Sequence, residues 1–442
     1  MKMKKANLTR RTFLGGSAAA SAGLLLRGLA TGIPPALLLN PHKAMSQGAN
    51  MRRQTLIMSV SQAGDPVNIN CPGSYINDAP RNFANNPLLS AVNGNFGGQT
   101  VRTAQPWAAL PNALRRRLAF FHLKTFAAAH TEFDQTLTLR GAVKSAAGNG
   151  SEMFPSMVAQ LNASHLGAIQ QEPLLLTGSR VSYESQPIQV TKPTAIKSLF
   201  TGAESALGDL RPLRDDTLDR LYAQLRASGS RPQMDFLERF VRGRDQARTL
   251  GNSLGTLLDR IPLNNDDKDS VEDQVIAACA LAQLGVAPAI IINIPFGRDN
   301  HQDSTLEAEA DQTRRGVASI ELMWNELNRL NIQDDVSFAM LNVFGRTFHR
   351  NSRGGRDHNR HHGVMVSFGR HVKGGVFGGV TGDGRCRNIR PNNGRPVNNG
   401  GIAADATLAT AGRSMCAALG MSNREIDQRI QGGRILAPFL NS

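Results

Sequence analysis

Four short stretches of the chain are continuously apolar. The first of them reads QTLIMSV, and a cluster of turn-forming residues, SQAGDP, follows it directly. Short runs without polar interruption are typical of strands that are buried on both faces of a sheet. We therefore predict strands at Gln54–Val60, Leu118–Leu123, Ala289–Ile294 and Val336–Val343.

Between these runs, apolar residues recur three or four positions apart, which is the spacing of one helix face. This spacing predicts helices at Asp215–Leu225, Met234–Ile261, Val271–Leu284, Thr305–Leu330 and Ala403–Leu419. Strands that alternate with helices indicate an α/β fold with a mostly parallel sheet flanked by helices. We expect residues 47–442 to form a single domain of this kind, with a helical insertion around residues 200–265.

The start of the chain carries an export signal. Arg10 and Arg11 stand side by side in Thr9–Leu14, after a lysine-rich start and before the weakly apolar stretch Gly15–Leu26. Paired arginines ahead of such a stretch are the address that the twin-arginine translocase reads. An arginine and two prolines come directly after the apolar stretch, so we expect no stable transmembrane span. Residues 1–46 are therefore predicted to be a signal peptide, and the protein to be periplasmic or secreted.

Positive charge is concentrated in one part of the mature chain. The 442 residues carry a formal net charge of +15, and the seven cationic residues of the signal peptide account for almost half of it. Between Arg346 and Arg395, eleven Lys or Arg residues meet only Asp357 and Asp383. Such a segment attracts anions, and a solvated basic face without a dedicated ligand is an equally good interpretation. We expect an anionic ester or an acidic envelope polymer as the partner, and no specific nucleic acid.

Some polar residues are expected to be buried. His122 and Cys279 lie within apolar runs, which favours a core histidine and a buried thiol. The four cysteines lack the close spacing of a zinc–thiolate site. A single disulfide between two of the residues Cys71, Cys386 and Cys416 is possible, because an exported protein reaches an oxidising compartment.

Acidic residues and histidines come after three of the predicted strands. Asp65 comes after the first, Asp299 and His301 after the third, and Asp357 and His358 after the fourth. In a parallel sheet these loops meet at one edge, where ligands bind in open α/β folds. Carboxylates with imidazoles suit zinc or manganese, and oxygen-rich sets suit magnesium or calcium. Taken alone, each pair is more often a capping or hydrogen-bonding arrangement than a metal site. Three such loops after successive strands make a divalent metal site as good an interpretation as hydrogen bonding.

The same loops belong to six motif-like segments, which are Gln62–Asp65, Phe296–His301, Asn342–Thr347, Gly354–His358, Gly363–Val366 and Val372–Gly378. Together they resemble exported bacterial proteins of the domain-of-unknown-function family 1501. That family shows a Ser-Glu-Phe-Gly-Arg-Thr run, a Gly-Gly-x-Asp-His step and an apolar strand with a Val-Lys-Gly-Gly turn. The resemblance covers most of the mature chain and is weakest between residues 149 and 264.

The resemblance implies a fold similar to the alkaline phosphatase and sulfatase superfamily. Members of that superfamily hydrolyse phosphate or sulfate esters at one or two metal ions. Carried over position by position, the resemblance implies that the metal ligands are Asp65, Asp299, His301, Asp357 and His358. It also offers three candidate anion-binding residues, which are Arg298, Arg346 and Lys373.

The chain departs from this family at two places. A Ser-His pair follows the family's second strand, whereas Ala129 and His130 stand here, so the hydroxyl nucleophile is missing. Thr131 would have to be reoriented to act as the nucleophile beside His130. Val343 replaces a glutamate, which removes a further ligand or base. Alanine and valine side chains can neither bind a metal nor attack an ester.

Two functions from different classes therefore remain open. In the first, a bound metal ion activates water, and the protein is a slow hydrolase of an anionic ester. In the second, catalysis has been lost, and the exported protein uses its basic segment to hold an acidic envelope component. The two substitutions favour a degraded site, whereas five candidate ligands favour a retained metal.

Overall fold

The computed structural model describes residues 53–64, 66–76, 86–178, 180–201, 220, 222–223, 257–258, 270–296 and 300–441. The chain divides into two compact units, one combining residues 46–193 with 265–442 and the other combining 1–45 with 194–264. The predicted signal peptide and most of the predicted helical insertion lie outside the described residues, so both stay predictions. Within the described ranges, no helix is long and apolar enough to cross a membrane.

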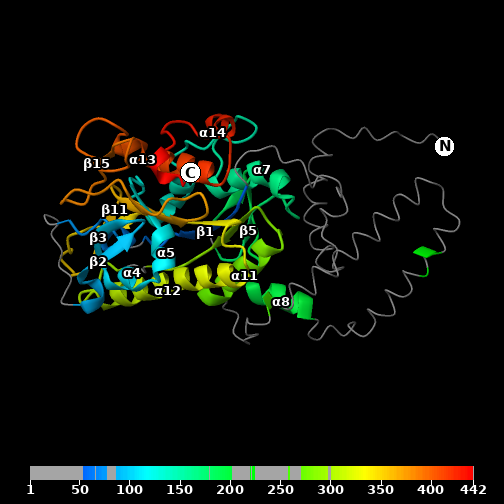
Figure 1. Ribbon diagram of the computed structural model, residues 1–442, viewed down its shortest axis with the longest axis horizontal. Helices are drawn as coiled ribbons and strands as arrows, with labels where there is room; N and C mark the ends of the chain where they lie inside the picture. Colours follow the sequence, from blue (N-terminus) through cyan, green and yellow to red (C-terminus); the bar gives the residue numbers. More distant parts are fainter. Residues whose placement is uncertain are drawn as a thin grey trace, which may run out of the picture. The chain divides into compact units, whose positions relative to one another are not determined.

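A seven-stranded sheet forms the centre of the larger unit (Figure 1). Six of these strands run in one direction, and β12 is antiparallel to both of its neighbours. In spatial order the strands are β13 (Gly375–Phe377), β4 (Ala119–Leu123), β12 (Gly363–Phe368), β9 (Val336–Asn342), β1 (Thr55–Ser61), β8 (Ala289–Ile292) and β5 (Leu174–Leu175). The mostly parallel α/β fold is thereby confirmed, and the four predicted strands match β1, β4, β8 and β9 closely.

Helices cover both faces of this sheet (Figure 1). One face carries α4 (Gln105–Ala109), α11 (Val271–Gln283) and α12 (Glu307–Arg329). The other carries α7 (Phe154–Leu166) and α13 (Thr407–Ala418), with α14 (Asn423–Arg429) packed on α13. The start of α11 is fixed by a capping box, in which Ser270 and Asp273 exchange backbone and side-chain hydrogen bonds.

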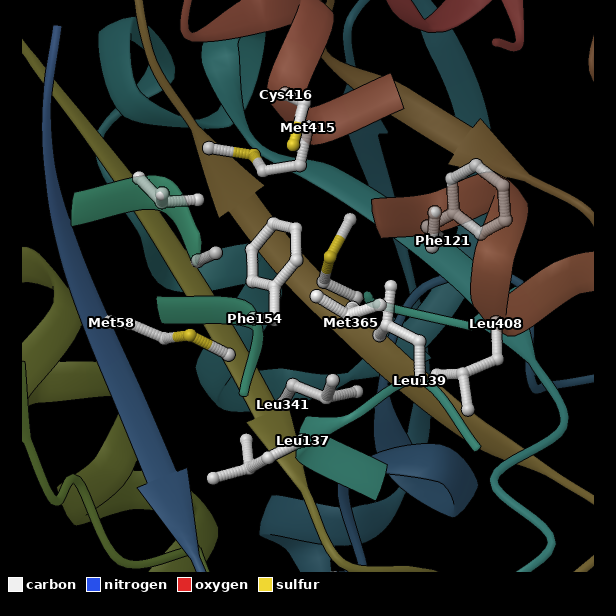
Figure 2. Packing of buried hydrophobic residues seen from close by; sticks show 14 of the residues in the cluster. Met58, Phe121, Leu137, Leu139, Phe154, Leu341, Met365, Leu408, Met415 and Cys416 are labelled. Carbon is white, nitrogen blue, oxygen red and sulfur yellow. The ribbon is translucent and has the colours of Figure 1, made fainter. Parts of the chain in front are cut away.

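The layer of α7 and α13 is held to the sheet by a large apolar cluster (Figure 2). Because side chains alternate along each strand, Met58, Leu341 and Met365 all point to this face. There they meet Phe154 of α7 and Met415 of α13. Burial of each such side chain contributes about 1.5–3 kcal/mol, so the cluster fixes both helices on the sheet.

Aromatic rings hold the opposite face. Trp107 of α4 stacks parallel to Phe296, with ring centroids 5.5 Å apart, and meets Phe120 of β4 edge-on at 5.1 Å. Gly316 of α12 lies against the ring of Phe296, where a Cβ atom would overlap it. The chain segment that leaves β8 is therefore anchored before it reaches the candidate site.

The remaining elements are short. They are α3 (Val67–Asn70), α5 (Asn112–Arg117), α6 (Phe133–Leu137), α8 (Pro193–Thr201), β2 (Ala91–Phe96), β3 (Gln99–Ala104), β6 (Ser182–Tyr183), β7 (Gln186–Pro187), β10 (Gly345–Arg346), β11 (His358–Asn359), β14 (Asn388–Ile389), β15 (Pro396–Val397) and the 3-10 turns η1 (Pro87–Leu89), η2 (His130–Glu132), η3 (Ala404–Ala406) and η4 (Ala437–Phe439). The hairpin of β2 and β3 and helix α7 were not predicted.

All four cysteines are buried thiols, and none forms a disulfide. The structure thus contains no bridge among Cys71, Cys386 and Cys416. Burial raises the pKa of the Cys386 thiol to about 12, so its reactive thiolate is strongly disfavoured at neutral pH.

Candidate functional site

The loops at one edge of the sheet bring together residues that are far apart in the chain. Strands β1, β4, β8 and β9 end at this edge, and the antiparallel β12 begins there. The loops place His130, His301, Arg346, Asp357 and His358 in contact with one another. The other predicted residues of this group, Asp65, Arg298 and Asp299, lie outside the described residues.

The three histidines are oriented in the same way. The Nδ1 atom of His301 lies 2.9 Å from Oδ1 of Asp357. The Nδ1 atom of His358 lies 2.7 Å from the carbonyl oxygen of Ala128, and that of His130 lies 2.6 Å from the carbonyl oxygen of Gln62. Carboxylate and carbonyl oxygens only accept hydrogen bonds, so each Nδ1 carries the proton. In this tautomer the lone pair of each ring is on Nε2, and Nε2 of His301 also faces Nη1 of Arg346.

Two of these Nε2 atoms face each other. Those of His301 and His358 are 3.0 Å apart. With both Nδ1 atoms protonated, the neutral rings would direct two lone pairs at one another, which is unfavourable. A cation shared by the two nitrogens, either a proton or a metal ion, relieves this repulsion. Burial, followed by smaller contributions that include Arg346, lowers the pKa of His358.

Asp357 stands behind His301 and serves as its hydrogen-bond partner. Its Oδ1 atom also accepts a hydrogen bond of 2.9 Å from the side-chain amide of Asn351. That bond is the main cause of the lowered pKa of Asp357, and His301 adds to it. In metal sites a carboxylate in this position orients the histidine that binds the metal. In the structure Asp357 therefore orients His301, and its role as a metal ligand stays a prediction.

A buried guanidinium completes the cluster. Arg346 is fully buried, and its Nε and Nη2 atoms donate to the carbonyl oxygens of Gly64 (3.1 Å) and Ala63 (2.8 Å). Its Nη1 atom lies 3.4 Å from Nε2 of His301. Loop backbone thus fixes a permanent positive charge beside the histidines, which suits the binding of an anion.

Aromatic packing sets the angle of the rings. Phe344 stacks on His358 with centroids 4.0 Å apart and lies 5.0 Å from His130. Gly64 adopts a φ of 70°, and a Cβ atom at this position would overlap the ring of Phe344. Glycine is therefore required where the loop after β1 passes beneath the site.

The position of the missing nucleophile lies in a closed turn. The N–H groups of Ala128 and Ala129 both donate to Oε2 of Glu132, which lowers the pKa of that carboxyl. Ala129 places no hydroxyl beside the histidines, and Thr131 is exposed. Val343 is fully buried and packs in the apolar cluster beneath the site. Val343 is therefore a core residue in this chain, and a glutamate at its position would be buried among apolar side chains.

Lys373 does not belong to this cluster. It lies in the turn between β12 and β13, beside Arg116 and Arg117, which immediately precede β4. The five residues of β4 separate this turn from the histidines, a rise of about 16 Å. Lys373 is therefore at the opposite edge of the sheet, away from His301 and His358.

A buried ion pair supports the site, and nothing in the sequence pattern indicated it. Arg356 and Glu309 of α12 are fully buried, and Nε of Arg356 donates to Oε2 of Glu309 over 2.6 Å. The N–H group of Arg356 also donates to the carbonyl oxygen of Asn300, 3.1 Å away. Arg356 thereby ties the loop before His358 both to α12 and to the loop that carries His301.

Two further buried histidines lie beneath Arg346. Nε2 of His122 points to the carbonyl oxygen of Pro72 (3.1 Å), so Nδ1 of His122 accepts from Nε2 of His362 (2.9 Å). Nδ1 of His362 in turn accepts from the side-chain amide of Asn68 (3.3 Å). Oδ1 of Asn68 accepts the N–H group of Arg346 over 2.7 Å. The expected core histidine His122 thus belongs to a chain of hydrogen bonds that ends at the site.

Within the described ranges, no group of three or more His, Cys, Asp and Glu side chains is placed to hold a metal ion. The donor atoms seen there are the facing Nε2 pair of His301 and His358, with His130 alongside. Asp65 and Asp299 could extend this set and are not among the described residues.

No protein-family model matches the chain, and no curated protein matches it. Two solved structures of Ps i-CgsB resemble it at 10% sequence identity, one of them in complex with k-i-k-neocarrahexaose. Their TM-scores are 0.34 for the complex and 0.31 for the protein alone. Each alignment covers 88% of this chain and 76% of that chain. A similarity at this level says nothing about the chemistry of the site.

Proposed function

We propose that this edge of the sheet is a metal-dependent binding site for a phosphate or sulfate ester, at which hydrolysis is slow or absent. The observation that carries the proposal is the common orientation of His130, His301 and His358. Each has its Nδ1 atom committed to an oxygen acceptor, which leaves the lone pair of Nε2 to bind a cation. This is the arrangement that metal-binding histidines adopt in proteins.

The proposed ion would be held by two of these histidines. His301 and His358 would hold it through the facing Nε2 atoms, and the resemblance adds Asp65 and Asp299 as proposed ligands. Imidazole with carboxylate favours zinc or manganese over magnesium or calcium. When bound, such an ion withdraws charge from the oxygens of an ester.

The chain's own residues would bind and orient the anion. Arg346 is locked by loop carbonyls and keeps its charge beside His301, so it would attract an anionic ester through its charge, although its own side chain is buried. The turn at Ala129 offers no hydroxyl to attack the ester, and the side chain of Thr131 is exposed to solvent. We therefore expect the site to bind the ester but not to hydrolyse it rapidly.

The test begins with elemental analysis of the intact protein purified without chelators. A metal-loaded protein should melt at a lower temperature after chelation, since an ion at a hundredfold excess over its dissociation constant stabilises the fold by about 2.7 kcal/mol. His301→Ala should lose both the metal and the chelator effect. His165→Ala, at a histidine whose side chain is 51% exposed, should keep both.

Activity separates the two functions. Hydrolysis of 4-nitrophenyl phosphate and 4-nitrophenyl sulfate should be weak, and Ala129→Ser should raise it in the metal-loaded protein. Metal binding without activity in either protein would favour a non-catalytic envelope-binding role. If the natural protein hydrolysed these esters rapidly, and Thr131→Val did so equally fast, the proposal that hydrolysis is slow or absent would be contradicted. Protein that contains no metal and melts identically with chelator would refute the metal site.

We also propose that the protein is exported by the twin-arginine pathway to the periplasm or beyond. The paired Arg10 and Arg11 support this proposal. Replacing both with lysine should retain the protein in the cytoplasm. An equal yield of periplasmic protein from the double variant would show that another pathway carries it.

A further inference from the structure

A second basic site lies at the opposite edge of the sheet from the histidines. A cavity of about 970 Å³ opens there between three segments of the chain. Its walls are the turn between β2 and β3, helix α5, and the turn between β12 and β13, which contains Lys373. A volume near 1,000 Å³ is at the upper end for small-molecule sites, so a single inorganic anion would fill little of it.

Among the described residues, more positive than negative charge lines the cavity. Four cations line it, which are Arg116, Arg117, Arg370 and Lys373, against the single carboxylate of Asp334. Asp334 is already paired with Arg117 over 2.7 Å. Among the described residues no carboxylate lies within ion-pair distance of the other three, whose side chains are exposed to solvent. Three positive charges from two separate segments are therefore directed at one space.

The walls that carry these charges are built to a fixed shape. A Cβ atom at Gly97 would overlap the carbonyl oxygen of Gly374, and one at Gly374 would overlap that of Arg116. Glycine thus allows three backbone segments to touch. The N–H group of Lys373 also donates to the carbonyl oxygen of Phe439 over 2.8 Å. The cations stand on a rigid frame, which lowers the entropy lost when a ligand binds.

The remaining lining is mostly polar. Asn112 and Asn441 offer amide groups that can donate to or accept from hydroxyls, and the amide of Asn441 also donates to the carbonyl oxygen of Arg370 over 3.1 Å. Val372 is the one aliphatic side chain among the lining residues, and no aromatic ring is among them. A single-stranded nucleic acid would call for aromatic stacking, and a membrane surface for exposed apolar side chains. Several anionic groups on a hydroxyl-rich body fit this lining best.

We propose that this cavity binds an acidic oligosaccharide that carries sulfate or phosphate groups. Arg116, Arg370 and Lys373 bind the anionic groups, and the amides of Asn112 and Asn441 bind sugar hydroxyls. The site is separate from the histidine cluster and does not depend on the metal proposed there.

The test uses the protein without its predicted signal peptide. The probe is a sulfated dextran oligosaccharide, and unsulfated dextran of the same length serves for comparison. Calorimetric titration at low salt should show binding of the sulfated probe alone. The triple variant Arg116→Gln/Arg370→Gln/Lys373→Gln should weaken it about tenfold or more, as expected from the loss of three exposed ion pairs. The single variant Lys373→Gln should give an intermediate affinity.

A matched control removes the same charge from elsewhere. Arg390→Gln/Arg424→Gln/Arg434→Gln replaces three exposed arginines that do not line the cavity. It should leave the affinity within about twofold. Equal weakening by both triple variants would overturn the proposal, because it would show a general attraction between charges. So would equal binding of the unsulfated probe, or no binding of the sulfated one.

Two other probes check the class of ligand. Vesicles that contain phosphatidylglycerol and a single-stranded oligonucleotide should both bind more weakly than the sulfated probe. Tighter binding of either one that the cavity variant abolishes would overturn the assignment to an oligosaccharide. Metal content should be the same in all these variants, so failure here and failure of the histidine site remain distinguishable.

Discussion

Acidification should destabilise the fold through the buried pair of His122 and His362. Both rings are completely buried, and their polar contacts are a backbone carbonyl, each other and the amide of Asn68. None of these partners is a carboxylate that could stabilise an imidazolium. Burial therefore lowers the pKa of His122 to about 4, against the opposing effect of the Pro72 carbonyl, and lowers that of His362 well below its usual value.

The direction of the effect is set by where the protons bind. Between pH 6.5 and about 4, unfolded His122 takes up a proton and folded His122 does not, so the unfolded state gains stability as the pH falls. The contribution is fully present above pH 6.5 and is lost as the pH drops through this window. The loss of unfolding free energy, relative to neutral pH, amounts to about 2 kcal/mol at pH 5 and about 3 kcal/mol at pH 4.

Urea denaturation at about pH 7.5 and about pH 5 measures this loss directly. His122→Gln removes one titrating group, so its loss of unfolding free energy between the two pH values should be about 2 kcal/mol smaller than that of the natural protein. His165→Gln, at an exposed position, should behave like the natural protein. Equal losses in the natural protein and in His122→Gln would refute the reasoning, because the pair would then not control the acid response.

Three further substitutions test the support of the site. Arg356→Met should cost about 3–5 kcal/mol in urea denaturation because it leaves Glu309 buried without its partner, and Arg356→Met/Glu309→Leu should recover part of that loss. Gly64→Ala should displace Phe344, lower the free energy of unfolding by about 1–3 kcal/mol and so lower the melting temperature. Gly148→Ala, in an open loop, should lower the free energy of unfolding by less. Val343→Glu should destabilise by at least about 3 kcal/mol at neutral pH without raising activity, since it buries a carboxyl in the core. A stable Val343→Glu protein with enhanced hydrolysis would contradict the core position.

The sequence predicted the strands that position the site, because each is an apolar run too short for a helix. It also predicted that His301 and His358 would meet, since both lie in loops that follow strands ending at one edge. The sequence did not show that Lys373 lies away from Arg346, because β12 runs antiparallel and an apolar run carries no information about strand direction. The turn after β12 therefore lies at the other edge.

Partnerships between distant side chains could not be predicted either. Arg356 and Glu309 are 47 positions apart, and only the fold makes them neighbours. The same holds for Asp357, which sequence pattern marks as an acidic loop residue without showing whether it faces a metal or a histidine. Its contact with His301 depends on the angle at which two loops cross.

The buried thiols make it possible to measure local opening of each helix layer of the protein. Cys279 lies in α11 on one face of the sheet, and Cys416 lies in α13 on the other, both without any exposure. Alkylating reagents can reach either one only when its own layer separates from the sheet. The rate of modification at each cysteine, read by mass spectrometry under mild denaturant, therefore reveals which layer opens first.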